Sequence, residues 1–466
     1  MAISTNCVWE VRTTGNANNG GGFVAGATGV DYSQQNAAQA STTAASVVHT
    51  STDQINVNAG DHTVSANDVG NIIQITGGTA TAGFYEILSV DVPNNRWTLD
   101  RSAGTAGQTV VSSMGGALDD WLGMWSIART GQKVFMKAGT YTRTTSCPFP
   151  SVGYGTPPFR LVGYNTTRGD TPTGTNRPLI QLSTNSNLIA IHMGDGTCEN
   201  IRIDCASLTN SSGIVCNNFS TYINCKVSNY GNVGFNVSNG AAYFCEVDGG
   251  SNQGFQISTG GSATYCWVHD TVGNFTGGFY ITGAHAKLVK CIASDNTGAF
   301  RDGFYCSAYN ITFINCISIG NGRHGINFDS GGGALNIGNI VNNCILMNNG
   351  AYGLNVPTNT AFTQQYDHNA YYNNTSGQKQ GFGTTGANGV SPYTTTDITL
   401  TGDPFTNSAA DDFSLNNTAG AGAACRETGW PGTIFPGGLV TDYTDVGTIQ
   451  HQGGGGGGSS QHSAVF

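Results

Sequence analysis

Seven copies of one short unit constrain the fold of this chain more than any other feature of its sequence. Each copy, between about residues 200 and 360, has a cysteine in a short apolar stretch, a polar turn, and a glycine followed by alternating apolar residues. The cysteines are Cys205, Cys225, Cys245, Cys266, Cys291, Cys316 and Cys344, and the glycines are Gly213, Gly234, Gly254, Gly278, Gly303, Gly325 and Gly353. A unit of 20 to 28 residues without helical periodicity predicts a β-solenoid.

The spacing also predicts which side chains face inward. We expect the Phe, Ile or Leu after each glycine to stack on its equivalent one coil away, roughly 4.8 Å along the axis. The cysteines take inward positions as small apolar residues. In-register side chains run parallel and do not converge, so a ladder of free thiols is expected rather than disulfides.

Composition and charge exclude several classes of partner. Only 10% of residues are charged, against about 25% in ordinary globular domains. The net charge of −10 leaves no basic stripe for nucleic acid. No window of 18 apolar residues exists, so membrane insertion is not expected. The start, MAISTNCVWEVRTTG, lacks the basic and apolar regions of a secretory signal. We therefore expect folding in a cytoplasm, and an extracellular or virion-surface location reached by another route.

The repeat resembles right-handed parallel β-helix proteins, the pectate-lyase-like superfamily in its broad sense, as found in phage virions and environmental bacteria. The likeness covers about residues 116–420. GALDDWLGMWSIARTG (116–131) is similar to the short N-terminal capping helix, KVFMKAGTYT (133–142) to the first-coil strand, and GDPFTNSAADDFSLN (402–416) to the terminal coil of such proteins. The resemblance implies an all-β fold, a right-handed parallel β-helix.

Three segments follow from these patterns. Residues 1–115 are predicted to form a β-rich head or attachment domain, with strands at 71–78, 83–91 and 96–104. Residues 116–420 form the β-helix with its caps, and residues 421–466 form an extension with a glycine-rich tail. Six consecutive glycines are typical of a flexible linker, and the tail is either inert or held by a neighbouring subunit.

One group of charged residues is the candidate site. Counted from the glycine of each unit, the same two positions hold Arg301 and Asp302 in one coil and Arg323 and His324 in the next. Asp270 and Asp295 each lie four residues after their cysteine, on the neighbouring turn. Register predicts one polar patch, and carboxylates beside Arg or His are what lyases and glycoside hydrolases need. The candidate catalytic residues are Asp270, Asp295, Arg301, Asp302, Arg323 and His324.

The same residues are also ordinary at solenoid turns, where opposite charges offset one another along a stack. Polygalacturonase-like hydrolases carry an Asn-x-Asp, an Asp-Asp, a Gly-His-Gly and an Arg-x-Lys on successive coils. Here the only Asp-Asp pairs lie at 119–120 and 411–412, in the predicted caps, and neither a Gly-His-Gly nor an Arg-x-Lys occurs. No run of clustered carboxylates indicates the calcium site of pectate lyases. Cys266 and His269 lack the second ligand pair of a zinc site. No metal and no cofactor are predicted.

These observations favour a non-enzymatic structural or adhesive surface protein, a phage virion fibre or spike component or a self-assembling extracellular filament subunit. Its expected partners are copies of itself, as a homo-oligomer (a trimer included) or filament, and a surface polysaccharide. The alternative is a tailspike-like polysaccharide lyase or glycoside hydrolase. Whether the protein is an enzyme stays open at this point.

Overall fold

The computed structural model describes residues 3–48, 51–120, 131–146, 158–183, 187–216, 219–273, 277–329, 338–356, 365–381, 396–426, 428–429 and 445–448. The chain forms two compact units. Unit 1 contains Met1–Thr142, Cys147–Ile180 and Gly194–Arg202, and unit 2 contains Arg143–Ser146, Gln181–Met193 and Ile203–Phe466. Among the residues described, no helix is long and apolar enough to cross a membrane.

Unit 1 contains a closed antiparallel barrel in the order β3-β4-β7-β6-β5-β8. The strands are β3 (Ala40–Val47), β4 (Gln54–Asn56), β5 (Ile72–Gly78), β6 (Gly83–Asp91), β7 (Arg96–Leu99) and β8 (Thr109–Met114). The three strands predicted from sequence match β5, β6 and β7. Asn95 turns the β6–β7 hairpin with a φ of 52°, a conformation that Asn tolerates well. Trp97, Ile73 and Ile87 fill the barrel core.

Unit 1 also contains a parallel sheet that begins near the N-terminus. Its strands are β2 (Gly22–Val24), β1 (Cys7–Val11), β9 (Lys133–Lys137), β11 (Phe159–Tyr164) and β14 (Gly196–Glu199). β1 runs antiparallel to β2 and parallel to β9. The predicted head segment therefore divides between the barrel and this sheet. Of the predicted capping helix, Leu118 forms a bridge with Val11, and residues 121–130 lie outside the described part.

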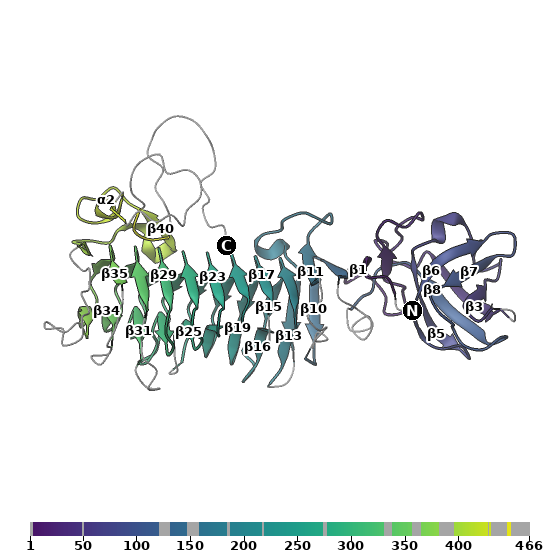
Figure 1. Cartoon of the computed structure of the whole chain (residues 1–466), viewed down its shortest axis with the longest axis horizontal. Helices are drawn as coiled ribbons and strands as arrows, with labels where there is room; N and C mark the ends of the chain where they lie inside the picture. The colour runs from purple at the N-terminus through teal and green to yellow at the C-terminus, as the bar shows by residue number, and fades with distance from the viewer. Residues whose placement is uncertain are drawn as a thin grey trace, which may run out of the picture. The chain divides into compact units, whose positions relative to one another are not determined.

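Unit 2 is a parallel β-helix in which each coil contributes one strand to each of three sheets (Figure 1). Sheet 1 contains β17 (Thr221–Ile223), β20 (Ala241–Tyr243), β23 (Ser262–Thr264), β26 (Lys287–Val289), β29 (Thr312–Ile314), β32 (Ile340–Asn342) and β35 (Gln365–Asp367). Sheet 2 contains β18 (Lys226–Ser228), β21 (Glu246–Asp248), β24 (Trp267–His269), β27 (Ile292–Ser294), β30 (Ile317–Ile319), β33 (Ile345–Met347), β36 (Ala370–Tyr372) and β38 (Ile398–Thr399).

Sheet 3 contains β13 (Ile189–Met193), β16 (Ser212–Cys216), β19 (Val233–Val237), β22 (Gln253–Ile257), β25 (Phe279–Ile281), β28 (Phe304–Cys306), β31 (Ile326–Phe328), β34 (Tyr352–Asn355) and β37 (Gly377–Gln380). Residues of β10 (Thr140–Arg143), β12 (Leu179–Leu182) and β15 (Arg202–Asp204) divide between the two units. Short helical turns occur at Ala66–Asp68, Gly174–Asn176, Ser408–Ala410 and Gly422–Cys425. The predicted right-handed parallel β-helix is confirmed.

The inward rows of unit 2 match the prediction from the repeat. Phe235, Phe255, Phe279 and Phe304 stack along sheet 3 with ring centroids 4.8, 5.0 and 4.9 Å apart. The predicted row of cysteines is buried, and its thiols are free. A glycine precedes each inward residue because the neighbouring backbone and side chains lie too close for a Cβ atom there. A Cβ on Gly254 would lie 2.5 Å from Val268 Cγ1 and 2.6 Å from the Gly278 oxygen.

A left-handed residue turns the chain from sheet 1 into sheet 2 just before each cysteine. Asn224, Asn315 and Asn343 have φ values of 51°, 55° and 57° there. Three consecutive coils instead place bulkier residues at this corner: Phe244 (φ 53°), Tyr265 (φ 53°) and Lys290 (φ 54°). The Phe244 and Tyr265 rings stack 5.1 Å apart, and Lys290 Nζ lies 5.0 Å from the Tyr265 ring. These contacts offset part of the backbone strain.

The prediction that residues 402–416 form a terminal coil is wrong. β39 (Phe405–Asn407) and β40 (Asp412–Leu415) form an antiparallel pair. This hairpin packs on the outer face of sheet 2, because the outward side chains of the later coils are apolar and need a cover. The shared core contains Ile292, Ile317, Ile319, Ile345, Met347, Ala370, Leu400, Phe405, Phe413, Leu415, Cys425 and Val446.

We predict that Gly254→Ala destabilises the protein by about 1–3 kcal/mol, because the new methyl group overlaps Val268 and the next coil's backbone. Chemical denaturation measured by circular dichroism tests this. Gly402→Ala is the matched control, since its Cβ would meet Ala421 Cβ at 3.6 Å and Gly402 has no positive φ. Equal stabilities of the two variants would contradict the packing argument.

Candidate functional site

Arg301 is buried inside the turn between sheets 2 and 3. Its guanidinium donates to the backbone oxygens of Asn252 at 2.7 Å, Gly273 at 3.1 Å and Val272 at 2.5 Å, and to Thr271 Oγ1 at 3.2 Å. The side chain is fully excluded from solvent, and burial lowers its pKa. Arg301 therefore holds successive turns together and has no surface available for a ligand.

Asp302 is also fully buried and is surrounded by donors. Arg323 donates to both of its carboxylate oxygens, from Nε at 2.8 Å and from Nη2 at 2.5 Å. The carboxylate also accepts the backbone N–H of His324 at 3.0 Å and the side-chain amide of Asn327 at 2.8 Å. Four donors on one buried carboxylate make a stable structural pair. The predicted adjacency of these two coils is therefore present, with its charges already matched.

His324, one of the predicted catalytic residues, is buried at its turn. Its relative exposure is 9%, and its ring stacks on Tyr352 with centroids 5.9 Å apart. The backbone N–H of Tyr352 donates to His324 Nδ1 at 3.3 Å, so that nitrogen acts as an acceptor. Burial lowers the pKa of His324, which keeps the ring neutral near pH 7. Arg323 remains half-buried at the edge of this group.

Asp270 and Asp295 belong to a different group on the outer face of sheet 2. Among the described residues, neither carboxylate forms a hydrogen bond or ion pair with Asp302, Arg323 or His324. Asp270 contacts His269, which forms with Lys226, Glu246 and Asp248 a group that sequence reasoning did not bring together. We call Lys226, Glu246, Asp248, His269 and Asp270 the acid–histidine cluster.

Strand pairing builds the acid–histidine cluster. Lys226 pairs in register with Glu246, and Asp248 with His269, so four outward side chains from three successive coils meet. His269 Nε2 lies 3.1 Å from Glu246 Oε1, and its Nδ1 lies 2.8 Å from Asp270 Oδ2. Lys226 Nζ bridges Glu246 at 2.6 Å and Asp248 at 3.1 Å. The repeat contains the signal for this: the outward positions fall one and three residues after each cysteine.

Opposing effects set the proton affinities in this cluster. Burial would raise the pKa of Glu246, but hydrogen bonds from His269 and Lys226 outweigh it and the pKa falls below its usual value. Burial would lower the pKa of His269, but hydrogen bonds to Glu246 and Asp270 raise it instead. Both ring nitrogens of His269 face carboxylates, which favours the doubly protonated imidazolium.

The covering hairpin ends beside this cluster. Phe413 meets the Trp267 ring at 6.2 Å, and Trp267 in turn stacks on His269 at 3.9 Å. Partial burial, followed by the Asp270 and Asp411 carboxylates, raises the pKa of Asp295. Burial also raises the pKa of Asp411. The edge thus contains one carboxyl with a lowered pKa and two with raised pKa values, a division suited to acid–base chemistry.

Glu246, Asp248 and His269 offer three metal-ligand atoms within 4.8 Å of one another. The Lys226 ammonium lies between both carboxylates, and it supplies the positive charge that a bound metal would otherwise provide. A metal would have to displace Lys226 and deprotonate His269. The contacts therefore favour an internal ion-pair network at this position.

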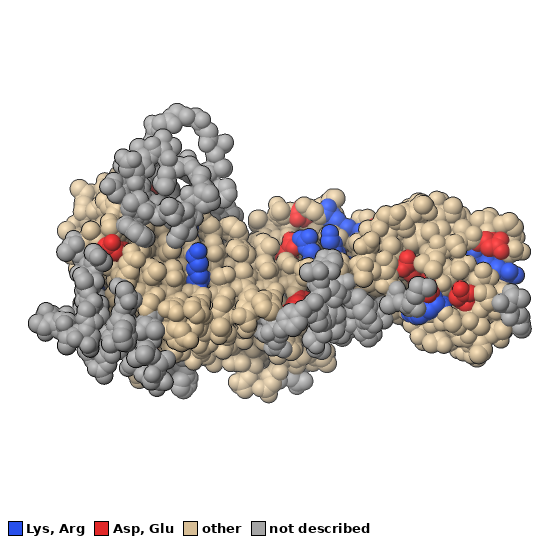
Figure 2. Space-filling model, viewed as in Figure 1, with Lys and Arg blue, Asp and Glu red and all other residues tan. Residues whose placement is uncertain are grey.

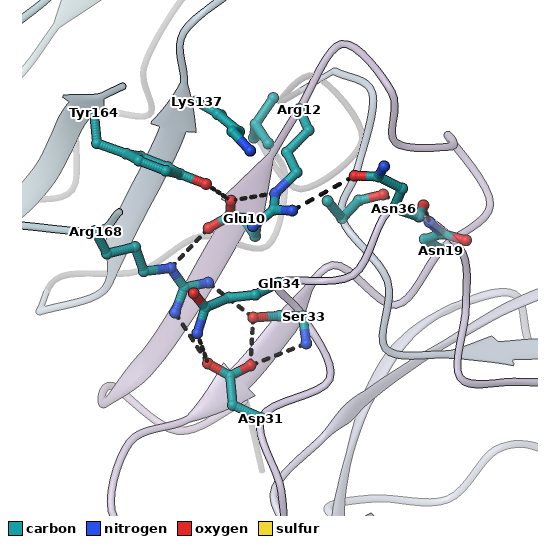
Figure 3. Close-up of polar contacts among 12 residues, drawn as sticks. Glu10, Arg12, Asn19, Asp31, Ser33, Gln34, Asn36, Lys137, Tyr164 and Arg168 are labelled. Atoms are coloured by element: carbon teal, nitrogen blue, oxygen red, sulfur yellow. Dashed lines mark hydrogen bonds and ion pairs between the residues drawn. The ribbon is translucent and has the colours of Figure 1, made fainter. Parts of the chain in front are cut away.

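Unit 1 contains a second buried network, drawn in Figure 3. Glu10 is fully buried and accepts from Arg12 at 2.7 Å, from Arg168 at 2.7 Å and from the hydroxyl of Tyr164. Arg168 also donates to Asp31 at 3.0 Å. Burial, and then the bond to Glu10, raise the pKa of Tyr164. These contacts tie β1 to the segment after β11, and every charged group in them has an opposite partner.

No protein-family model and no curated protein matches the chain. Among solved structures, pectate lyase Pel9A is similar over 73% of this chain and 92% of its own, at 14% identity and a TM-score of 0.49. ORF18 of Geobacillus virus E2 is similar over 53% and 52%, at 12% identity and a TM-score of 0.37. The Dettilon tailspike protein gp208 is similar over 54% and 60%, at 8% identity and a TM-score of 0.31.

A lyase and a tailspike protein both occur among these similar structures, and the identities are too low to carry an activity to this chain. The assignment of the fold rests on the strand pairing described above. Function has to be argued from the surface of this chain.

We predict that His269 stabilises the fold at low pH. Its pKa is raised on folding, so its contribution is complete below the ordinary value of 6.5 and is lost as pH rises through the folded-state pKa. The free energy of unfolding of wild type relative to His269→Gln should therefore be constant below pH 6.5 and fall as pH rises above it. Urea denaturation at each pH measures it, with the exposed His285→Gln as control. A difference that does not change with pH would contradict this prediction.

Proposed function

We propose that this protein is a non-enzymatic structural and adhesive component of an extracellular or virion surface, and that it self-associates. The observation that carries the proposal is the state of three of the six predicted catalytic residues. Arg301 is saturated by backbone oxygens, Asp302 by four donors, and His324 is buried. A general base must reach a substrate, and none of these groups is free to do so.

The rest of the surface supports a scaffold. Charged side chains are few on the face drawn in Figure 2, where most of the described surface carries neither sign. The coil interior is built from stacked apolar rows, which make a rigid support along the helix axis. A rigid and weakly charged β-helix surface suits contact with a polymer or with copies of itself more than it suits catalytic turnover.

We predict that the purified protein forms discrete oligomers or filaments. Negative-stain electron microscopy and sedimentation velocity, run across a hundredfold range of concentration, check this. A particle that stays monomeric at every concentration would sink the self-association part of the proposal.

A second function is favoured by one observation, the acid–histidine cluster. Glu246 has a lowered pKa, and Asp295 and Asp411 have raised ones, beside an aromatic ring at Trp267. Such a division could serve a glycoside hydrolase, which needs two carboxyl groups of different proton affinity. Against it, Glu246 is held by both Lys226 and His269. The structural and adhesive function is therefore favoured over a glycoside hydrolase.

We expect no release of reducing ends or of unsaturated uronates from a panel of bacterial and plant polysaccharides. Wild type would be assayed beside Glu246→Gln, Asp295→Asn, Arg323→Ala and His324→Ala. Cleavage by wild type that is lost in Glu246→Gln or Asp295→Asn would establish a hydrolase at the acid–histidine cluster and the adjacent Asp295. Cleavage that is lost in Arg323→Ala or His324→Ala would instead show that the catalytic patch predicted from sequence is correct.

A further inference from the structure

The outer face of sheet 3 carries a row of uncharged hydrogen-bonding side chains. Strand pairing puts Gln256 beside Tyr280, Tyr280 beside Tyr305, Tyr305 beside Asn327, and Asn327 beside Asn355. These five residues, which we call the amide–tyrosine row, occupy one position on five consecutive coils. The repeat fixes their spacing at one coil, roughly 4.8 Å.

The two tyrosines form the centre of the row. Their rings stack with centroids 5.5 Å apart and an interplanar angle of 30°, and both side chains are half-buried. The hydroxyl of Tyr305 donates to Asp329, which fixes the orientation of its ring. A fixed, partly exposed aromatic pair costs little further ordering when it meets the C–H face of a sugar ring.

The flanking amides are ordered and keep hydrogen-bonding capacity. Asn355 Nδ2 donates to Asn327 Oδ1 at 2.7 Å, and Gln256 Oε1 accepts from Asn236 at 3.3 Å. Among the described residues, no hydrogen bond uses Asn355 Oδ1 or Gln256 Nε2. An acceptor and a donor are therefore available on either side of the tyrosine pair, as a chain of hydroxyl groups would require.

Charge decides the kind of polymer. Asn327 of the row donates to Asp302, and the charge of Asp302 is already matched by Arg323. Asp329 adds a carboxylate beside Tyr305. A polysaccharide with uronate or other acidic groups would meet carboxylates here with no unmatched cation in this network, which disfavours its binding.

We propose that the amide–tyrosine row binds an uncharged linear polysaccharide, lying along the axis of the β-helix across several coils. The proposal rests on the adhesive function proposed above and names the ligand class and the face that contacts it. The acid–histidine cluster lies on sheet 2 and takes no part in this binding.

Affinity electrophoresis in gels containing dextran, galactomannan or polygalacturonate tests the proposal. Wild type should be retarded by at least one of the two neutral polymers and not by polygalacturonate. The double variant Tyr280→Ala/Tyr305→Ala should bind about tenfold more weakly, the loss expected for stacking worth about 1.4 kcal/mol. Asn355→Asp retains the shape and replaces the amide by a charge, and it should also weaken binding.

Phe244→Ala is the matched control, because Phe244 is an exposed aromatic residue at the corner between sheets 1 and 2 and lies outside the row. It should bind as wild type does. Circular dichroism confirms that each variant is folded, and if the double variant is not, Asn355→Asp alone decides.

Retardation by polygalacturonate alone, equal binding by wild type and the folded row variants, or no retardation by either neutral polymer would overturn the proposal. Oligomers or filaments seen by electron microscopy without such binding would leave the structural role standing while this inference fails.

Discussion

The stacking of identical coils is the constraint on which the structure of unit 2 depends. Each inward residue packs on its own equivalent, as the phenylalanine rings at 4.8–5.0 Å show, so a residue that fits in one coil must fit the next. The glycine before each ring follows from the same constraint. A Cβ on Gly234 would lie 2.6 Å from the Gly254 oxygen of the next coil. Large and small positions are therefore linked along the axis.

Once the inward rows are fixed, each outer face follows from the residues between them, and the faces differ. On sheet 2 the same outward row changes from Glu246 and Trp267 to Ile292 and Ile317. The apolar part is covered by the C-terminal hairpin, and the polar part forms the acid–histidine cluster where that cover ends. Sheet 3 has no such switch in its amide–tyrosine row. One repeating backbone thus supports two chemically different surfaces.

The sequence was sufficient for the inward rows because the cysteines and glycines mark register directly. It also contained the acid–histidine cluster, since Glu246 and Trp267 each follow a ladder cysteine by one residue and Asp248 and His269 by three. The position of Arg301 could not be derived in this way. The turn that holds it is one of two in which twelve residues, rather than eight or nine, separate cysteine from glycine. Register fixes strands, but the fold of a longer turn depends on backbone acceptors that no pattern reveals.

The prediction that residues 402–416 form a terminal coil was wrong for a related reason. Its alternating apolar residues satisfy the pattern of a coil strand, and only the need to cover Ile317 and Ile345 decides that it lies outside the coil. The same logic separates the two groups of predicted site residues. The buried carboxylates of Asp302 and Glu10 are already paired with arginine side chains, which disfavours a role for either in catalysis. The side chains that can contact another molecule are those in outward rows that still have unused hydrogen-bond donors or acceptors.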